Sequence, residues 1–260
     1  MYPFINFFGI SLPAYGICGI IGIAAALGFA YIRNRRVKLE NDDVLHITLF
    51  AAIGAVIGSK LLYMITAIPS VIKNFDKIEW SFQLVMDFIQ YGYVFYGGLI
   101  GALLMVLWYC RRYKVDIDKV ILVAVPVIPL FHAFGRVGCF MAGCCWGMEC
   151  SWGVVYTNSV AAPNGVAFLP IQLIEAGLNL LLFIVLFLCA DRFKNPRRLL
   201  CAYIFAYGIM RFILEFFRGD TVRGVAILST SQWISLALCA AAAVYIAADI
   251  LRKKEKTVKQ

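Results

Sequence analysis

Charged residues are scarce in this chain. Lysine, arginine, aspartate and glutamate together make up 15% of its 260 residues, whereas hydrophobic residues make up 62%. In soluble globular proteins about half of the residues are apolar and about a quarter are charged. The composition therefore excludes an ordinary soluble globule and indicates a chain that is embedded in a lipid bilayer.

Long apolar segments, by contrast, recur along the whole chain. A helix of about 20 apolar residues crosses the hydrocarbon core of a bilayer. The sequence therefore predicts an all-α integral membrane protein, a single polytopic domain over residues 1–260, with seven transmembrane helices at about 12–32, 44–66, 93–110, 119–135, 171–190, 199–217 and 229–251. No short apolar region with a small-residue cleavage site precedes the first segment, so we expect that segment to be retained.

Acidic residues are outnumbered by basic ones, 15 against 24, which gives a net charge of +9. Most of the basic residues lie at alternate ends of the predicted spans, which argues against a nucleic-acid partner. Cationic loops remain in the cytoplasm during membrane insertion. We therefore predict an amino terminus outside and a carboxy terminus in the cytoplasm.

Histidine is rarer still, and one of the two histidines opens an unusual run of sixteen residues, from His132 to Gly147. The run contains Arg136, three cysteines and four glycines. A charged side chain at bilayer depth costs a few kcal/mol and normally marks a pathway or a site. Glycines let the backbone leave helical geometry and approach a ligand closely. This run is therefore the first candidate for a functional site, whereas we interpret the other histidine, His46, as structural.

The sixth predicted span carries a second polar pattern. Tyr207, Arg211, Glu215 and Arg218 follow one another at intervals of four, four and three residues, which places them on one face of a helix. Either Arg211 and Glu215 form an ion pair that neutralises both charges in lipid, or the face lines an internal cavity. Two arginines around one glutamate would leave a surplus positive charge, and the guanidinium fork suits phosphate oxygens.

Shorter patterns begin the third and fifth predicted spans. Gln172 and Glu175 share one helix face near the membrane surface, although Glu175 could simply favour the positive end of the helix dipole. Gly97 and Gly98 follow Tyr96 at the start of the third span. The pair Gly97 and Gly101 could simply permit close helix packing, and the tyrosine could belong to the aromatic belt at the membrane interface.

Together these patterns resemble the prolipoprotein diacylglyceryl transferase family. Residues 96–101 are similar to that family's His-Gly-Gly-Leu-Ile-Gly, and residues 135–144 to its signature Gly-Arg-x-Gly-Asn-Phe-x-Asn-x-Glu. Residues 170–175 are similar to its Pro-x-Gln-Leu-Tyr-Glu, and residues 12–16 to the start of its first span. Residues 207–220 resemble its penultimate helix almost residue for residue. The resemblance covers nearly the whole chain.

The resemblance implies a membrane enzyme of the bacterial cytoplasmic (inner) membrane, with no cofactor and no metal. Such an enzyme moves the diacylglyceryl group of phosphatidylglycerol to the lipobox cysteine thiol of a preprolipoprotein signal peptide, and it releases glycerol phosphate. The resemblance implies that Arg136 and Arg211 hold the lipid phosphate and stabilise the leaving group. The residues expected to bind or orient the substrate are Tyr15, Lys60, Gly97, Gly98, Gly138, Cys139, Cys144, Gln172, Glu175, Tyr207, Glu215 and Arg218.

Four residues depart from the family pattern on the side of the reaction that handles the thiol, one of them Ala142 at the second signature asparagine. Tyr96 replaces the histidine proposed as the base, Cys139 replaces the signature asparagine and Cys144 replaces the signature glutamate. His132, one helical turn before Arg136, could supply the base instead, although a lone histidine is more often packed in a core. The predicted catalytic residues are therefore Arg136, Arg211, Tyr96 and His132.

The cysteines Cys139, Cys144, Cys145 and Cys150 form a cluster with the spacing C-x4-C-C-x4-C. Disulfides are permitted outside the cytoplasmic membrane, and a thiolate metal site is possible although the spacing is not the usual C-x2-C. A reactive thiol beside a cation and packing of small residues also remain open. The acceptor could accordingly differ from a lipobox thiol, or the chain could be a membrane thiol-redox or metal-binding protein on the same fold.

Overall fold

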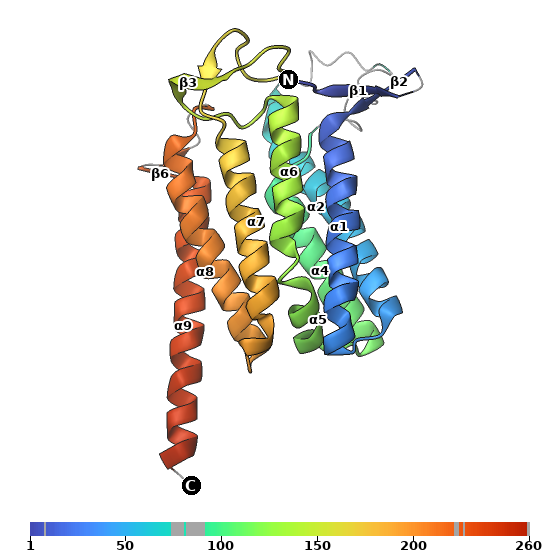
Figure 1. Cartoon of the computed structure of the whole chain (residues 1–260), viewed down its shortest axis with the longest axis vertical. Helices are drawn as coiled ribbons and strands as arrows, with labels where there is room; N and C mark the ends of the chain where they lie inside the picture. The colour runs from blue at the N-terminus through green and yellow to red at the C-terminus, as the bar shows by residue number, and fades with distance from the viewer. Residues whose placement is uncertain (8, 74–80, 82–91, 221–223, 226, 259–260) are drawn as a thin grey trace. The chain divides into compact units, whose positions relative to one another are not determined.

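The computed structural model describes the chain except for residues 8, 74–80, 82–91, 221–223, 226 and 259–260 (Figure 1). The described residues form mainly helices, with short two-stranded antiparallel sheets between some of them. The helices group into two compact units, one formed by Met1–Lys38 with Asp118–Gln260 and the other by Leu39–Ile117. The single domain predicted over residues 1–260 stays a prediction.

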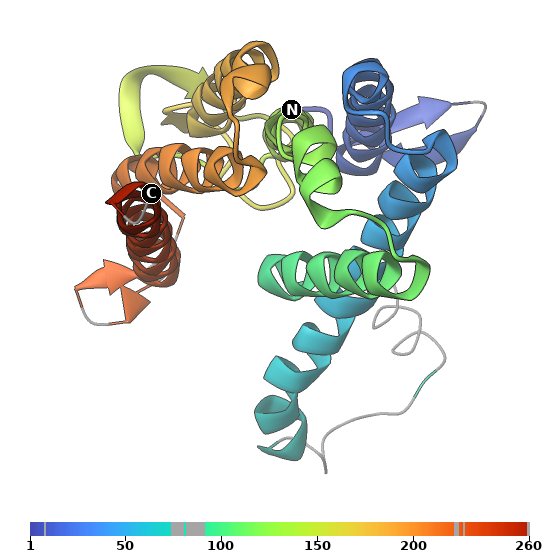
Figure 2. The ribbon, with the colours of Figure 1, turned by 90° about the horizontal axis from the view of Figure 1, so that it is seen from below.

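The long helices of the first unit lie side by side in a row (Figures 1 and 2). Their order in the row is α1 (Ala14–Val37), α6 (Ile128–Ala142), α7 (Ile171–Cys189), α8 (Pro196–Leu214) and α9 (Thr230–Val258). A short helix, α5 (Ile117–Ala124), precedes α6, and the two are bent by 45° at their junction. Pro126 and Pro129 lie at this junction, where proline removes a backbone donor and ends a helix.

Apolar length identifies the helices that can cross a membrane. Within the described residues these are α1, α2 (Asn41–Lys73), α7, α8 and α9, and the bent pair of α5 and α6 together would make a sixth. The structure is therefore that of a multi-pass helical membrane protein. The span predicted at 93–110 forms α4 (Phe95–Tyr113), which is not among the helices that are long and apolar enough to cross a membrane; its last turn contains Arg111 and Arg112.

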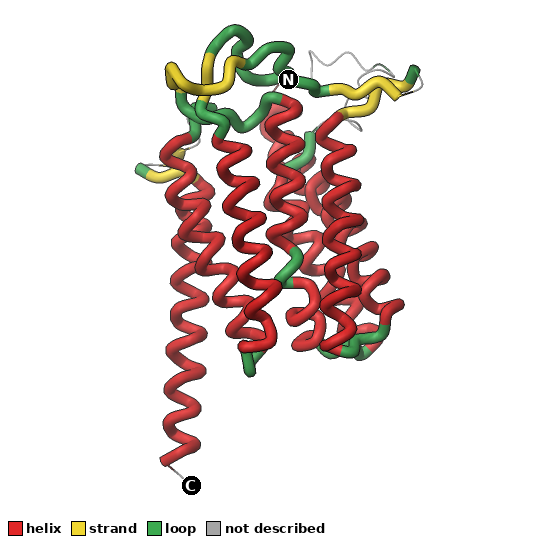
Figure 3. The backbone as a smooth tube through the Cα atoms, in the orientation of Figure 1, coloured by secondary structure: helices red, strands yellow, loops and turns green. Residues whose placement is uncertain are grey.

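The short strands of the first unit gather at one end of its helices (Figure 3). They are β1 (Phe4–Phe7) with β2 (Ile10–Pro13) before α1, β3 (Glu149–Val155) with β4 (Ala167–Phe168) between α6 and α7, and β5 (Gly224–Val225) with β6 (Leu228–Ser229) between α8 and α9. They share this end because α1, α7 and α9 start there and α6 and α8 end there.

The segment between α6 and α7 is fixed by backbone contacts. Gly143 ends α6 with φ +75°, a left-handed conformation that suits glycine. The Ser159 hydroxyl donates to the Gly143 carbonyl (2.9 Å) and accepts from the amide of Ala162 (2.9 Å). Further along, the amide of Gly147 donates to the carbonyl of Leu169, just before α7. This segment is therefore tied at both of its ends.

The two long helices of the second unit, α2 and α4, cross closely because glycines meet at the crossing. A Cβ atom on Gly58 would lie 2.3 Å from the carbonyl oxygen of Gly97, and one on Gly101 would lie 2.1 Å from that of Gly54. A Cβ on Gly98 would lie 3.1 Å from another α2 carbonyl. Small residues let helix backbones approach in this way, so the packing interpretation of Gly97 and Gly101 is confirmed.

Candidate active site

A single buried carboxylate joins two arginines that come from different helices. Glu175, in the second turn of α7, is only 2% exposed, and its Oε1 lies 3.0 Å from Nε of Arg136 in α6. Its Oε2 lies 3.7 Å from Nη1 of Arg211 in α8. An unpaired carboxylate at such a position would cost several kcal/mol. The two guanidinium groups therefore give this buried side chain its ion-pair partners, and the carboxylate fixes their positions.

Arg211 makes a second ion pair with a residue that directly follows its own helix. Its Nη2 lies 2.5 Å from Oε2 of Glu215, the first residue of the 3-10 turn Glu215–Phe217. Of the two alternatives left open by the spacing, the ion pair is therefore present. The same nitrogen is 3.5 Å from the hydroxyl of Ser231 in α9. Nη1, however, is buried and has no hydrogen-bond acceptor among the described residues. Because an unsatisfied buried donor is costly, this N–H is available to an anionic ligand.

Arg218, just beyond α8, pairs elsewhere. Its Nε and Nη2 donate to the two carboxylate oxygens of Asp220, at 2.8 and 2.6 Å, and both side chains are 5% exposed. The arginines of this region are thus matched one for one by the carboxylates of Glu175, Glu215 and Asp220. The prediction of a surplus positive charge on the α8 face is therefore wrong. Glu175 from α7 pairs with Arg211, and Asp220 from the loop after α8 pairs with Arg218.

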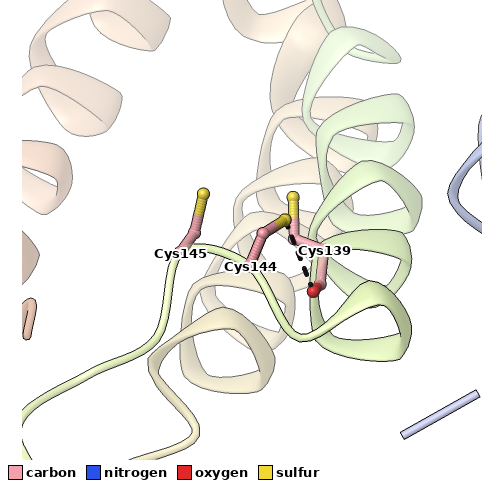
Figure 4. Close-up of side chains that lie close together, drawn as sticks. All are labelled: Cys139, Cys144 and Cys145. Atoms are coloured by element: carbon pink, nitrogen blue, oxygen red, sulfur yellow. Dashed lines mark hydrogen bonds between the residues drawn. The ribbon is translucent and has the colours of Figure 1, made fainter. Parts of the chain in front are cut away.

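Three thiols gather at the end of α6 (Figure 4). Cys139 belongs to the last turn of the helix, and Cys144 and Cys145 follow the glycine that ends it. The Sγ atoms of the three residues all lie within 4.8 Å of one another. The Cys144 thiol donates to the carbonyl of Cys139 (3.6 Å). All nine cysteines of the chain lie in its described part and are free thiols, so the structure contains none of the disulfides considered from the spacing.

Cys150 does not join these three thiols. It lies in β3, where it packs beside Leu169, Ile171 and Leu214. A Cβ atom on Gly153 would lie 2.8 Å from its sulfur. The predicted cluster of four cysteines is therefore wrong in one member, because the strand carries Cys150 into an apolar contact.

The loop that bears Cys144 and Cys145 is held by α7 and by the end of α8. The buried amide of Gln172 donates from Nε2 to the carbonyl of Cys144 (2.8 Å). On its other side Gln172 accepts a hydrogen bond from the hydroxyl of Tyr156 (3.1 Å), a residue with no exposed surface. A β-bridge joins Gly147 to Arg218. The side chain of Gln172 thus binds the backbone of the loop that bears Cys144 and Cys145.

Electrostatics distinguish Cys145, which lies in the loop beyond α6. Hydrogen bonds from the Cys139 and Cys144 thiols, together with the positive charge of Arg218, hold the pKa of the Cys145 thiol well below its usual range. Arg136 acts in the same direction. The environment of the Cys145 sulfur therefore favours the thiolate form of that residue.

Two further candidates lie between α6 and α8. The ring of His132, one turn before Arg136, packs at 5.3 Å from the ring of Tyr207, which stacks on Tyr203 at 5.9 Å. This aromatic contact fits the alternative in which the histidine is a packed residue. His132 and Arg136 both belong to α6, in the first unit.

Tyr15 and Gly138 meet where α1 crosses α6. A Cβ atom on Gly138 would lie 3.2 Å from Cα of Tyr15 and 3.1 Å from Cβ of Cys18, so glycine permits the close approach. Tyr15 begins α1 and is 53% exposed. Its ring is therefore accessible next to the helix that carries Arg136.

The remaining candidates, Lys60, Tyr96, Gly97 and Gly98, belong to the second unit. The Nζ of Lys60 lies 4.9 Å from the ring centre of Tyr93 and 5.3 Å from that of Tyr63, a cation–π arrangement. Tyr96 meets Phe95 edge to face, at 5.7 Å. Gly97 and Gly98 lie at the crossing of α2 and α4 described above.

Sequence reasoning did not assign Tyr156, Ser231 or Asp220 to the site. Asp220 had a signal, because it follows Arg218 by two residues within the motif on residues 207–220. Tyr156 and Ser231 lie outside any periodic pattern, and only the packing of distant segments brings them to Gln172 and Arg211.

Comparison with known proteins extends these observations. A family model described as prolipoprotein diacylglyceryl transferase matches residues 3–248. The chain belongs to the prolipoprotein diacylglyceryl transferase family. The family membership inferred from the sequence motifs is thereby confirmed.

Curated relatives match along most of their own length. A phosphatidylglycerol–prolipoprotein diacylglyceryl transferase of Clostridium tetani is 33% identical over 231 residues, which cover 88% of this chain and 90% of the relative. Phosphatidylglycerol–prolipoprotein diacylglyceryl transferase 2 of Clostridium perfringens is 30% identical over 231 residues, 88% of each chain. A transferase of the same name from Dehalococcoides mccartyi is 31% identical over 254 residues, 94% of this chain and 92% of the relative. The similarity therefore includes the loops that carry the site as well as the apolar spans.

Proposed function

We propose that this protein transfers the diacylglyceryl group of phosphatidylglycerol to the cysteine thiol of a prolipoprotein, forming a thioether and releasing glycerol phosphate. Family membership and the names of its relatives support the two substrates. The structural observation that carries the proposal is that Glu175 forms ion pairs with both Arg136 and Arg211. A buried carboxylate between two guanidinium groups is a fixed frame for a phosphodiester.

The frame has donors left for the lipid phosphate. Glu175 engages only Nε of Arg136, and Nη1 of Arg211 is buried without a hydrogen bond in the described structure. A phosphodiester oxygen bound there would satisfy the buried donor of Arg211. As the bond from the glyceryl carbon to oxygen breaks, negative charge grows on this phosphate. Positioned donors of this kind are each worth about 3–4 kcal/mol of transition-state stabilisation.

The balance of charge in the network suits an enzyme that must fold in lipid before its substrate arrives. Glu175 and Glu215 neutralise the arginines in the absence of substrate, which lowers the cost of burying them. They also hold each guanidinium in one orientation, so that little freedom is lost when the phosphate binds. Guanidinium groups that are held in place by Glu175 and Glu215 therefore support binding of a monoanionic phospholipid.

The acceptor thiol must lose a proton, and here the chain departs from its family. Tyr96 stands at the histidine position, and His132 packs beside Tyr207 on the helix of Arg136. These two residues are the proposed candidates for a protein base. Tyr15, Gly138 and Gln172 are proposed to border or support the site of the lipid headgroup.

In the membrane we propose seven spans, with α4 as the seventh, an external amino terminus and a cytoplasmic carboxy terminus. The location would be the bacterial cytoplasmic membrane, with the reaction at its outer face and the lipobox signal peptide approaching within the bilayer. Two features support this orientation. The strands and the thiol loop share one end of the first unit's helices, while the basic last turn of α1 and the basic first turn of α8 lie at the other.

Transfer of labelled lipid tests the proposal directly. Purified protein in lipid vesicles is incubated with phosphatidylglycerol labelled in its diacylglyceryl group and with a lipobox peptide containing cysteine, and the matched serine peptide is the control. We expect label on the cysteine peptide only, in a bond that resists hydroxylamine. Absence of transfer here, together with failure to restore lipoprotein lipidation in a bacterium depleted of its own transferase, would overturn the proposed activity.

A further inference from the structure

The separation of the three sulfurs at the end of α6 suits a metal ion better than a disulfide. The Sγ atoms of Cys139, Cys144 and Cys145 lie within 4.8 Å of one another. Zinc–sulfur bonds of about 2.3 Å in tetrahedral geometry separate the sulfurs by about 3.8 Å. The thiols therefore need to close by no more than about 1 Å, whereas a disulfide requires contact at about 2.05 Å.

The protein backbone holds the thiols in this arrangement by itself. Cys145 adopts φ +60°, a left-handed conformation that is strained for a residue with a side chain. Strain of this kind costs about 1–3 kcal/mol and persists only where surrounding contacts impose it. Here the imposing contacts are the hydrogen bond from Gln172 to the Cys144 carbonyl and the bridge between Gly147 and Arg218. Such supporting contacts are what orient metal ligands in known sites.

The surrounding charges fit a bound dication. Three thiolates and Zn²⁺ carry a net charge of −1, and the guanidinium groups of Arg136 and Arg218, each also paired with a carboxylate, are near enough to act on the sulfur of Cys145. Arg136 precedes Cys139 by one helical turn, and Arg218 is bridged to Gly147, two residues after Cys145. The sulfurs also lie at the carboxy-terminal end of α6, where the helix dipole favours a cation.

The ligand set indicates both the kind of metal and an open coordination position. Thiolates select thiophilic ions such as Zn²⁺ over Mg²⁺ or Ca²⁺. Structural zinc sites are closed by four protein ligands, whereas catalytic sites use three and keep the fourth position for a substrate or water. The fourth cysteine of the sequence pattern, Cys150, packs in β3 instead. Cys144 and Cys145 are only half-buried, which leaves the site accessible.

We propose that Cys139, Cys144 and Cys145 bind one Zn²⁺ ion whose fourth position binds the acceptor thiol of the substrate. The role of the ion rests on the proposed function, since the acceptor is a thiol only in that reaction. The inference replaces the expectation, drawn from the family resemblance, that no metal is involved.

The ion would supply what the chain lacks on the thiol side. The acceptor thiol binds zinc and releases its proton to water, because a thiol that coordinates zinc is deprotonated. A sulfur lone pair then forms the bond to the glyceryl carbon. The bond from that carbon to the phosphate oxygen breaks, and its electron pair leaves with glycerol phosphate, held by Arg136 and Arg211. The neutral thioether dissociates from the ion and water replaces it, with no change in oxidation state.

This proposal accounts together for three of the four departures from the family pattern, all except Ala142. With a metal-bound thiolate, no base is needed at position 96, where Tyr96 replaces histidine. Cys139 and Cys144, which replace the signature asparagine and glutamate, become ligands.

Metal content tests the site without reference to activity. The wild type and the four single variants Cys139→Ser, Cys144→Ser, Cys145→Ser and Cys150→Ser are purified under reducing conditions, and zinc is measured by mass spectrometry on the monodisperse fraction. We expect about one zinc per chain for the wild type and for Cys150→Ser, and a large loss for the other three. Reconstitution with Co²⁺ should give thiolate-to-cobalt charge-transfer absorption in the wild type and in Cys150→Ser only. Wild-type protein that binds neither ion, or that carries a disulfide among the three cysteines after reducing purification, would overturn the site.

Activity with and without metal separates this inference from the proposed function. Zinc-free wild type should bind phosphatidylglycerol normally but transfer no label to the lipobox peptide, and Zn²⁺ but not Mg²⁺ should restore transfer. Full transfer by zinc-free protein would overturn the role of the ion and leave the proposed function intact. Zinc bound by the three cysteines without transfer to any thiol would support the site but overturn both the acceptor role and the proposed function.

Discussion

The side chain of Gln172 reaches back from the first turn of α7 to the backbone carbonyl of Cys144, at 2.8 Å. This contact links the helix that carries Glu175 to the loop that carries two of the thiols. The phosphate frame and the thiol cluster are therefore coupled through a single helix start. We therefore expect a substitution in the phosphate frame to alter the thiol cluster, and the reverse.

The first prediction concerns the two arginines of the frame. Arg136→Ala and Arg211→Ala should each lower the rate of diacylglyceryl transfer by about 10²–10³-fold, because a donor to the developing phosphate charge is lost. Lysine at either position should restore only part of the rate, since it lacks the bidentate fork. Transfer of labelled lipid is the measurement, with membrane insertion checked by protein yield. Arg35→Ala, an exposed change at the far end of α1, serves as the control. Near-normal transfer by both alanine variants would contradict the assignment.

The second prediction concerns the support of the thiol loop. Gln172→Ala should lower the free energy of unfolding by about 1–3 kcal/mol, because the buried Tyr156 hydroxyl and the Cys144 carbonyl both lose a partner. Tyr156→Phe removes one partner only and should cost less. Thermal unfolding in detergent measures the effect. Tyr2→Phe, at a residue 72% exposed, should leave the melting temperature unchanged. An unaltered melting temperature for Gln172→Ala would show that the loop is held by other contacts.

The third prediction separates backbone strain from steric clash at the end of α6. Gly143 has φ +75°, and a Cβ there would lie 2.2 Å from the hydroxyl oxygen of Ser159. Gly165 has φ +84° and open space around the same position. Gly165→Ala should therefore cost about 1 kcal/mol of stability through strain alone, and Gly143→Ala distinctly more. Gly135→Ala, in a helix with open space, is the control and should be neutral or slightly stabilising. Equal losses at 143 and 165 would rule out the clash.

The fourth prediction concerns topology. Single cysteines replacing Lys73 or Asn164 should react with an impermeant thiol reagent added to intact cells, whereas those replacing Lys114 or Lys194 should react only after lysis. The background lacks the accessible native cysteines. Arg223, a further external position by its charge pattern, lies outside the described residues. Labelling at position 114 in intact cells would contradict the seven-span arrangement.

Features that depend on one continuous segment could be predicted from the sequence. The apolar spans that became α1, α2, α7, α8 and α9 are local properties of composition and length. The ion pair of Arg211 with Glu215 follows from helical periodicity, and the close crossing at Gly97 follows from small residues. Family membership was visible because its motifs are likewise short runs of adjacent residues.

Contacts between distant segments were decided only by the tertiary structure. Helix packing brings Glu175 to both arginines and turns an expected cationic face into a balanced network. Because β3 diverges from the end of α6, Cys150 leaves the cysteine cluster, while the turn after Gly143 brings Cys144 and Cys145 back to Cys139. Charge balance and sulfur separation are sums over side chains from several elements. Sequence spacing determines neighbours within one helix, whereas the burial of apolar faces determines which helices, and therefore which charges and thiols, meet.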